Sequence, residues 1–178
     1  MPSPVGHALA GIAAGWLAAP PASSVSSRAF RLQAAILGAV AVAPDLDLLI
    51  NRHSRETHSV GAAAIVATIA ALWRWPVAAT RGRIWAAIFL AWVSHPLLDA
   101  LAIDTAPPIG VMAFWPFSRE HMQTGLAIFS PISRNWGQPG LVAHNAWAVV
   151  RELAILGPIT AAVWWLRRRS IPGAPRPR

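Results

Sequence analysis

Five apolar stretches, separated by short polar segments, dominate the hydropathy pattern of the chain. A helix that crosses the hydrocarbon core of a bilayer needs about 20 mainly apolar residues. The Ala, Gly and Val content of these stretches is typical of helices that pack closely in lipid. The pattern therefore predicts an all-α fold, a polytopic membrane bundle of about four to five transmembrane helices. The stretches cover residues 4–19, 32–50, 57–75, 84–103 and 141–166.

A long loop, from about Asp104 to Gly140, precedes the last apolar stretch. It is rich in Pro, Gly and Trp, and a loop of this length usually has a function or packs on the rest of the protein. We expect it to form a lid over a site. Residues 1–166 are interpreted as one membrane-embedded domain, and the basic segment 167–178 as a flexible tail. The first stretch has no basic region before it and no small-residue cleavage site, so it is expected to remain as a helix.

Composition agrees with a membrane protein and excludes other classes. Hydrophobic residues make up 55% and charged residues 12%, against about 45–50% and about 25% in soluble domains. The apolar content excludes a disordered chain, and the absence of cysteine excludes a disulfide scaffold. Fifteen basic and seven acidic residues give a net charge of +8. Because no basic run lies on a polar fold, a nucleic-acid partner is not expected. The expected partner is the lipid bilayer.

The arginines predict an orientation, because cytoplasmic loops of membrane proteins carry an excess of positive charge. With five spans, ten arginines lie on the side of the C-terminus and four on the other side, and Arg151 falls within the last span. We therefore expect an inner-membrane protein with a cytoplasmic C-terminus and an outer N-terminus. The ten are Arg28, Arg31, Arg74, Arg81, Arg83, Arg167, Arg168, Arg169, Arg176 and Arg178, and the four are Arg52, Arg55, Arg119 and Arg134.

The histidines and most of the acidic residues fall near the opposite, non-cytoplasmic ends of the predicted helices. Up-and-down connectivity brings them to one face, whereas a random distribution would divide them between both. Ionisable side chains near a bilayer are costly and usually mark a functional site. The residues that converge are His7, Asp45, Asp47, His53, His58, His95, Asp99, His121 and His144.

The sharpest motif is His95-Pro-Leu-Leu-Asp99. Residues four apart on a helix share one face, with Cβ atoms about 5–6 Å apart, so both side chains can reach one divalent ion. Zinc takes His nitrogen at about 2.0–2.1 Å and carboxylate oxygen at about 2.0–2.2 Å. Alone, the motif is more often a packed histidine beside a helix-end aspartate. Its convergence with Asp45, Asp47 and His58 favours a metal site, with zinc as the expected ion.

Two further aspartates and one further histidine complete the predicted site. Asp45 and Asp47 face different directions on a regular helix, so either one is an inner ligand or, near the helix end, both reach the ion. An aspartate that is not a ligand is a candidate general base. His7, at the start of the first helix, is predicted as a ligand because it converges with the other groups.

The polar segment after Asp47 offers two candidate phosphate-binding residues. Arg52 and Arg55 suit bidentate binding of a phosphate, and anchoring in the headgroup layer explains them equally well. Thr57 is predicted to cap the third helix, which would put His58 just inside it.

Other ionisable residues carry weaker predictions. His53 and His121 lie in loops, where solvated side chains are the default. His144 and Glu152 lie on roughly the same face of the last helix. Glu152 is expected to pair with an Arg or, alternatively, to serve a second metal ion.

In order and spacing, these motifs resemble the YdjM-like membrane-bound metal-dependent hydrolases, over about residues 1–120. More distantly, they are similar to the zinc-dependent phospholipase C and single-strand nuclease group. The motifs are His7, Pro44-Asp45-Leu46-Asp47, Arg52-His53, Thr57-His58-Ser59, His95-Pro-Leu-Leu-Asp99 and Trp115-Pro116-Phe117-Ser118.

The resemblance implies an all-helical enzyme with clustered zinc ions. His95 and Asp99 match the zinc pair of that group, with Asp99 bridging two ions. Asp45 or Asp47, together with His58, would bind the first ion and His7 the second. Ala148 stands where a third ion would need a Glu four residues after His144, so one or two ions are expected.

The leading hypothesis is a membrane-bound hydrolase that uses metal-activated water on a phosphate ester of a lipid or envelope precursor. The alternative is a non-catalytic metal-binding or metal-transport membrane protein. Transport would place the ligands near mid-membrane with access to both sides, whereas these residues gather at one face. A structural protein whose polar face packs on a partner is a further alternative.

Overall fold

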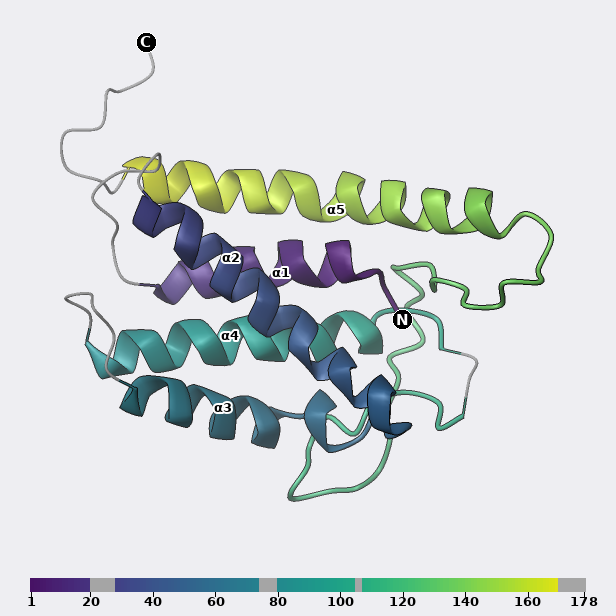
Figure 1. Cartoon of the computed structure of the whole chain (residues 1–178), viewed down its shortest axis with the longest axis horizontal. Coiled ribbons are helices and arrows are strands. Elements are labelled where there is room, and N and C mark those ends of the chain that lie inside the picture. Colours follow the sequence, from purple (N-terminus) through teal and green to yellow (C-terminus); the bar gives the residue numbers. More distant parts are fainter. Residues whose placement is uncertain (20–27, 74–79, 105–106, 170–178) are drawn as a thin grey trace, which may run out of the picture.

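Five α-helices run back and forth along one long axis, with α2 crossing its neighbours obliquely (Figure 1). The computed structural model describes residues 1–19, 28–73, 80–104 and 107–169, and within them two 3-10 helices and no strand accompany the α-helices. The predicted all-α class is therefore confirmed. The elements are α1 (Pro4–Ala18), α2 (Arg28–Val42), η1 (Ala43–Ile50), η2 (Glu56–His58), α3 (Val60–Leu72), α4 (Arg81–Ala100) and α5 (Leu141–Arg169).

The helix boundaries differ from the predicted ones by up to four residues, as at α3 (Val60–Leu72) and α4 (Arg81–Ala100), and two further differences affect the second and last helices. The second helix begins at Arg28 and changes from α to 3-10 geometry after Val42. Pro44 accounts for the change, because it has no N–H to continue the α-helical ladder. The last helix continues to Arg169, so the first three residues of the predicted tail are helical. Residues 170–178 lie outside the described part of the chain.

Two helical segments of the described chain are long and apolar enough to cross a membrane by length and composition: Arg28–Ile50 and Leu141–Arg169. Two shorter apolar helices, Pro4–Ala18 and Val60–Leu72, accompany them. Large apolar side chains are exposed on the outer faces of the helices, for example Ile69 on α3 and Trp147 on α5. The prediction of four to five transmembrane helices is thus supported for two of the helices.

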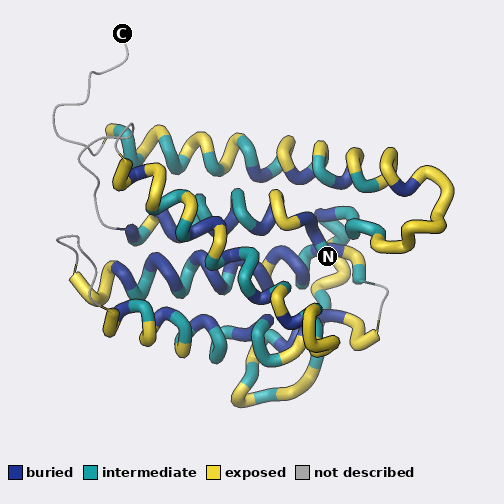
Figure 2. The backbone as a smooth tube through the Cα atoms, in the orientation of Figure 1, coloured by how far each residue is buried: buried dark blue, intermediate teal, exposed yellow. Residues whose placement is uncertain are grey.

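Helix α1 lies in the middle of the bundle and packs against α2, α4 and α5. Glycines allow the close approach. A Cβ on Gly11 would lie 2.1 Å from the Cβ of Ala41, and a Cβ on Gly15 would lie 2.5 Å from a methyl group of Leu37. Small residues four apart are a common means of bringing membrane helices together. Figure 2 shows the result, with buried backbone along α1 and α4 and exposed positions along α5.

An apolar core fills the end of the bundle where α1 and α5 terminate. Trp16 stacks on Phe30 with ring centroids 4.8 Å apart, and Ile84 and Ile88 of α4 belong to the same buried cluster. Arg167 closes this end, since its guanidinium donates to the carbonyl oxygens at the C-terminus of α1, those of Trp16 and Ala19.

The long loop after α4 folds back over the opposite end of the bundle. Its backbone is bonded to the bundle at several points. The N–H of Val60 donates to the carbonyl of Ala113 at 2.9 Å, and the N–H of Thr124 donates to that of Ala100 at 3.0 Å. The loop therefore packs on the rest of the protein, as its length predicted, and it covers the end that holds the histidines.

Candidate metal centre

The six predicted metal ligands come together under this loop, although they belong to four separate elements. His7 lies on the first turns of α1, the two aspartates on η1, His58 on η2, and His95 and Asp99 on α4. Their side chains form overlapping groups whose candidate ligand atoms lie within 4.8 Å of one another. The groups are His7–His95–Asp99, Asp45–His58–His95 and Asp47–His53–His58.

A tight turn at Asn51 and a hydrogen bond from Trp92 position η1 and η2 against the bundle. Asn51 adopts a left-handed conformation (φ 54°) that ends η1, a conformation that Asn tolerates better than most residues. The indole of Trp92, on α4, donates to the carbonyl of Thr57 at 2.8 Å and fixes η2 against the bundle.

Four candidate ligand atoms surround the centre of the site. The Nε2 atoms of His58 and His95 are 3.1 Å apart. Asp45 Oδ1 lies 3.7 and 3.5 Å from these two nitrogens, and Asp99 Oδ2 lies 3.5 and 3.2 Å from them. Ligands at zinc-like bond lengths on a tetrahedron are about 3.3–3.4 Å apart. The five distances among these atoms are close to this value, so the two histidines can share an ion with either aspartate.

Hydrogen bonds on the far side of each ring orient the two nitrogens toward this centre. His95 Nδ1 lies 2.6 Å from the carbonyl oxygen of Ala41, which can only accept, so Nδ1 carries the proton. His58 Nδ1 lies 3.1 Å from Asp47 Oδ2. Both Nε2 atoms then present lone pairs at the centre. Partners of this kind usually hold metal-binding histidines in place.

His7 extends the site beyond the first four atoms. Its ring stacks on that of His95, with centroids 3.7 Å apart, and its Nε2 lies 3.5 Å from Asp99 Oδ1. Asp99 thus offers one oxygen to each side, an arrangement that suits a carboxylate shared by two ions.

Several of these buried atoms have no hydrogen-bond partner among the described residues. They are both ring nitrogens of His7, Asp45 Oδ1 and both carboxylate oxygens of Asp99. The side chains of His7, His58 and His95 are 0% exposed. Because an unpaired buried polar group costs about 1–3 kcal/mol, so many in one place indicate that the site is built for a ligand. Cation binding by His nitrogens and carboxylate oxygens fits that donor set.

Asp47 lies behind the centre rather than in it. Its Oδ2 accepts a hydrogen bond from Thr57 Oγ1 at 2.6 Å and contacts His58, while its Oδ1 lies 3.0 Å from His53 Nδ1. Both oxygens are therefore occupied by protein partners. Asp45 Oδ1, which faces both Nε2 atoms, is the better placed candidate ligand, whereas Asp47 orients His53 and His58 and also forms a candidate group with them.

His53 was expected to be a solvated loop residue, and this expectation was wrong. Besides its contact with Asp47, its ring meets that of His58 edge-on, with centroids 4.7 Å apart. The signal that could have found it is local: a histidine six residues after Asp47, beyond a tight turn at Asn51, is brought back to the aspartate.

The predicted N-cap at Thr57 was also wrong. Ser59 caps α3, since its Oγ accepts from the N–H of Ala62 at 3.0 Å. The hydroxyl of Thr57 is used on Asp47 instead, and His58 lies in η2, outside the α-helix.

Glu152 has a different partner from the expected Arg. Its fully buried carboxylate accepts from the N–H of Ser3 at 2.7 Å and from the Ser3 hydroxyl. Ser3 Oγ in turn accepts from the N–H of Gly6 and caps α1. Glu152 therefore anchors the N-terminus of α1, four residues before His7. Sequence reasoning missed this role, because 149 residues separate the two partners.

Arg52 and Arg55 lie on the surface near the site. Arg52 pairs with Glu56 at 2.7 Å, with both side chains well exposed, and Arg55 is exposed as well. A hydrogen bond from its own backbone and the neighbouring Arg52 hold the pKa of the Glu56 carboxyl below its usual value. The two arginines contact the metal-ligand cluster through their backbones: the N–H of Arg52 donates to the carbonyl of Asp47, and the carbonyl of Arg55 accepts from the N–H of His58.

The two remaining histidines stay apart from the cluster. His144 is exposed on α5 and its Nε2 donates to the carbonyl of Pro131 at 2.8 Å. His121 is half-buried in the long loop. In the described part of the chain, neither belongs to a group that could hold an ion.

Comparison with known families places the chain. The sequence model of the YdjM inner membrane protein family matches residues 1–170. The chain belongs to this family. As a YdjM inner membrane protein it associates with the lipid bilayer, and the match spans all five helices rather than the first 120 residues. No curated protein and no solved structure matches this YdjM family member.

Proposed function

We propose that this YdjM family member is a membrane-bound hydrolase that holds one or two divalent ions, zinc being the expected metal, and cleaves a phosphate ester. The observation that carries the proposal is the close spacing of His58 and His95 with each of Asp45 and Asp99, at buried atoms several of which lack protein partners. Phosphate-ester chemistry is supported by the resemblance of the motifs to the phospholipase C group.

The ligand positions follow from the distances. His58, His95, Asp45 and Asp99 would hold the first ion, and His7 with the second oxygen of Asp99 would contribute to another. An ion held there would act as a Lewis acid. It would lower the pKa of bound water to about 7, so that the water can act as a nucleophile at neutral pH.

His53 is the proton-transfer group in this proposal. Its Nδ1 faces the carboxylate of Asp47 at 3.0 Å, which can only accept, so the proton is held on Nδ1 and Nε2 keeps a lone pair. The side chain is 24% exposed, whereas that of Asp47 is 2% exposed. Asp47 therefore acts as the residue that fixes the tautomer of His53, and His53 takes or gives the proton.

The proposed orientation has five membrane-embedded helices, with the site on the non-cytoplasmic side and the C-terminus in the cytoplasm. Exposed apolar residues on α1, α3 and α5, for example Leu17, Ile65 and Leu153, support contact of these helices with lipid. The test is a reporter fused to the C-terminus. If a reporter that is active only outside the cytoplasm is active at the C-terminus, the C-terminus lies outside. The site, which is at the other end of the bundle, would then lie in the cytoplasm.

Metal content of the purified protein tests the proposal. Wild type should hold one or two zinc ions per chain, and the variant with both His95→Ala and Asp99→Ala should hold none. The variant His144→Ala is the matched control, because it removes an exposed histidine outside the cluster and should keep the metal. Absence of stoichiometric metal from wild type would sink both the hydrolase and the metal-binding alternative.

Substrate assays then separate an enzyme from a metal-binding protein. Wild type should cleave phosphate esters in a zinc-dependent manner, and His53→Gln should lose about 10²–10⁴-fold in rate, the usual contribution of acid–base catalysis, while it keeps the metal. Metal binding without cleavage of any phosphodiester or phosphomonoester would favour the non-catalytic alternative.

A further inference from the structure

A cavity of about 260 Å³ opens beside the metal-ligand cluster. The end of α4, the segment before α1 and two parts of the long loop form its wall, and Asp99 and His53 both line it. The rings of His7, His58 and His95 are 0% exposed, and the Asp45 side chain, outside the cavity wall, is 13% exposed. The cavity therefore offers a small molecule an approach to the cluster at Asp99.

One arginine lines this cavity, and it is not one of those that the sequence suggested. Arg134 is exposed, and its guanidinium contacts the sulfur of Met1. A thioether is a weak acceptor, and within the described chain Arg134 is in no ion pair. Arg52, in contrast, is engaged by Glu56 outside the cavity. A phosphate oxygen is a much stronger partner for a guanidinium than a thioether is.

The remaining wall limits the charge and the size of the occupant. Asp104 contributes a carboxylate, whose Oδ2 accepts from the N–H of Gly110 at 2.9 Å. Asp99 is assigned to the proposed ion, which leaves Arg134 and Asp104 as the charged pair of the wall, and this pair suits a singly charged anion better than a doubly charged one. Ile103, Val111 and Ile132 supply apolar surface. Ligand pockets usually measure about 300–1,000 Å³, so this cavity takes the head of a molecule and leaves long chains outside.

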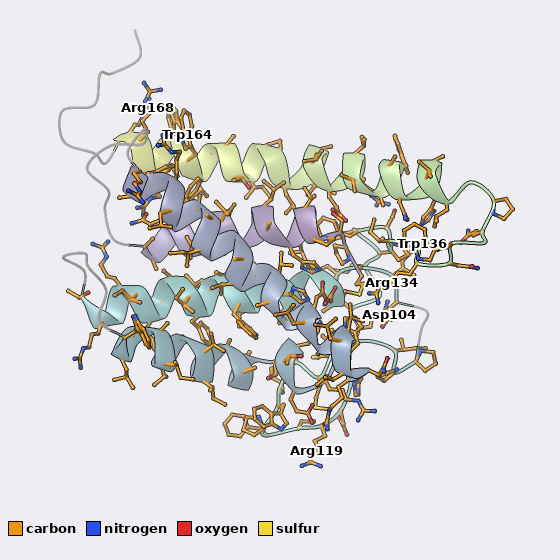
Figure 3. All side chains as sticks on the ribbon, viewed as in Figure 1. Asp104, Arg119, Arg134, Trp136, Trp164 and Arg168 are labelled. Atoms are coloured by element: carbon orange, nitrogen blue, oxygen red, sulfur yellow. The ribbon has the colours of Figure 1, made fainter. Side chains whose placement is uncertain are left out.

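We propose that this cavity binds the head of a phosphodiester, with Arg134 contacting its phosphate and Asp99 facing it from the metal side. The proposal rests on the hydrolase function above and adds the substrate class and the anion-binding residue. Figure 3 shows Arg134 and Asp104 at the same end of the molecule, with Arg119, also in the long loop, pointing away from them.

The experiment measures binding rather than turnover. Diethyl phosphate, a singly charged diester, is titrated into the zinc-loaded full-length protein in detergent micelles, and ethyl phosphate, a monoester, is titrated in parallel. Wild type should bind the diester more tightly. Arg134→Gln should weaken diester binding by about 10- to 100-fold, the usual loss for a charged hydrogen bond, with zinc content unchanged. Arg119→Gln is the control and should bind as wild type does.

A second variant tests the cavity itself. Ile103→Trp places a larger side chain in the wall and should also weaken diester binding while zinc is retained. Equal diester binding by wild type and Arg134→Gln, or no diester binding by wild type, would overturn the proposal. Tighter binding of the monoester than of the diester would overturn the assignment to diesters.

The two proposals fail separately. If Arg134→Gln leaves zinc-dependent hydrolysis unchanged, the proposed diester binding in the cavity is refuted and the proposed hydrolase function stands. Arg134-dependent diester binding without any hydrolysis would refute the hydrolase and keep the cavity. Phosphatidylglycerol vesicles serve as the lipid source of the same chemistry: cleavage of this lipid identifies a membrane substrate, and cleavage confined to soluble diesters identifies a soluble one.

Discussion

The two ends of the helical bundle are built from the same helices and filled with opposite chemistry. At one end Trp16, Phe30 and Ile88 form an apolar core, and Arg167 satisfies the carbonyls at the end of α1. At the other end α1 and α4 bury His7, His95 and Asp99, several of whose polar atoms lack protein partners. At the first end, Trp16 Nε1 is a buried polar atom without a hydrogen-bond partner among the described residues. At the second end five such atoms lie on His7, Asp45 and Asp99, which the proposed ions would bind.

Metal removal should produce the largest difference between the two ends. A ligand at 1,000 times its Kd stabilises the folded state by about 4 kcal/mol, or about 10 °C in melting temperature for a domain of this size. A chelator should therefore lower the Tm of wild type in detergent by that amount and leave the Tm of His95→Ala with Asp99→Ala unchanged. The same Tm with and without chelator in wild type would contradict the proposed ion.

Gly11→Ala should affect both ends, because Gly11 lies where α1 and α2 touch. The new methyl group would lie 2.1 Å from the Cβ of Ala41, whose carbonyl accepts from His95. We expect a loss of about 3 kcal/mol in unfolding free energy, together with weaker zinc binding.

Gly157→Ala is the matched control for that change. Gly157 lies within α5 and a Cβ there meets nothing within 4 Å. The usual preference for Ala over Gly in a helix is offset here, because Pro158 crowds a Cβ at the residue before it, so this variant should change stability by less than about 1 kcal/mol. Equal effects of the two substitutions in thermal unfolding would refute the close contact at Gly11.

Glu152→Gln should weaken the polar end alone. An amide can accept only through its one oxygen, so one of the two donors of Ser3 loses its acceptor, at a cost of about 2 kcal/mol. Because Ser3 caps α1 just before His7, zinc affinity should fall as well. Zinc titration and thermal unfolding both measure this. A loss of stability with unchanged zinc affinity would mean that Glu152 supports the fold without positioning His7.

Arg167→Gln should weaken the apolar end alone. The substitution removes charged hydrogen bonds to the carbonyls of Trp16 and Ala19, worth about 1.5 kcal/mol. Zinc affinity should not change. In the double variant with Glu152→Gln the two stability losses should add, since distant sites behave independently. Strong non-additivity would show that the two ends are coupled.

Arg52→Gln should have the smallest effect. Its ion pair with Glu56 is well exposed, and such pairs contribute about 0–1 kcal/mol. Stability, zinc content and diester binding should all remain close to wild type. The sequence suggested Arg52 as a phosphate-binding residue, and the cavity gives this role to Arg134. A large loss of diester binding in Arg52→Gln would support the assignment to Arg52.

The sequence predicted the fold class and the grouping of the ionisable residues, because both depend on periodic patterns. Hydropathy located the helices, and alternating direction then forced His7, Asp45 and His95 to one end. The motif His95–Asp99 could be read directly from helical spacing. These inferences need no knowledge of the contacts between helices.

The finer assignments depend on contacts that no local pattern contains. Asp45 and Asp47 are equivalent in the sequence, and only the 3-10 turn and the hydroxyl of Thr57 separate the ligand position from the orienting one. Arg134 enters the cavity, and Glu152 meets Ser3, through loop and helix packing between residues far apart in the chain. Whether the shorter helices α1 and α3 cross the membrane likewise depends on how they pack in lipid rather than on their length.

The distribution of the cluster over four elements has a consequence for how the protein matures. No single helix carries more than two of the six candidate ligands, so a chain that has not yet emerged from the ribosome past Asp99 has no complete site. The first proposed ion would be captured only after the η1–η2 turn and α4 have been inserted and have met, and a second one only after α1 has joined them. Once bound, the second ion would link residue 7 to residue 99 and oppose their separation. Bound zinc would therefore report that insertion and helix assembly are finished.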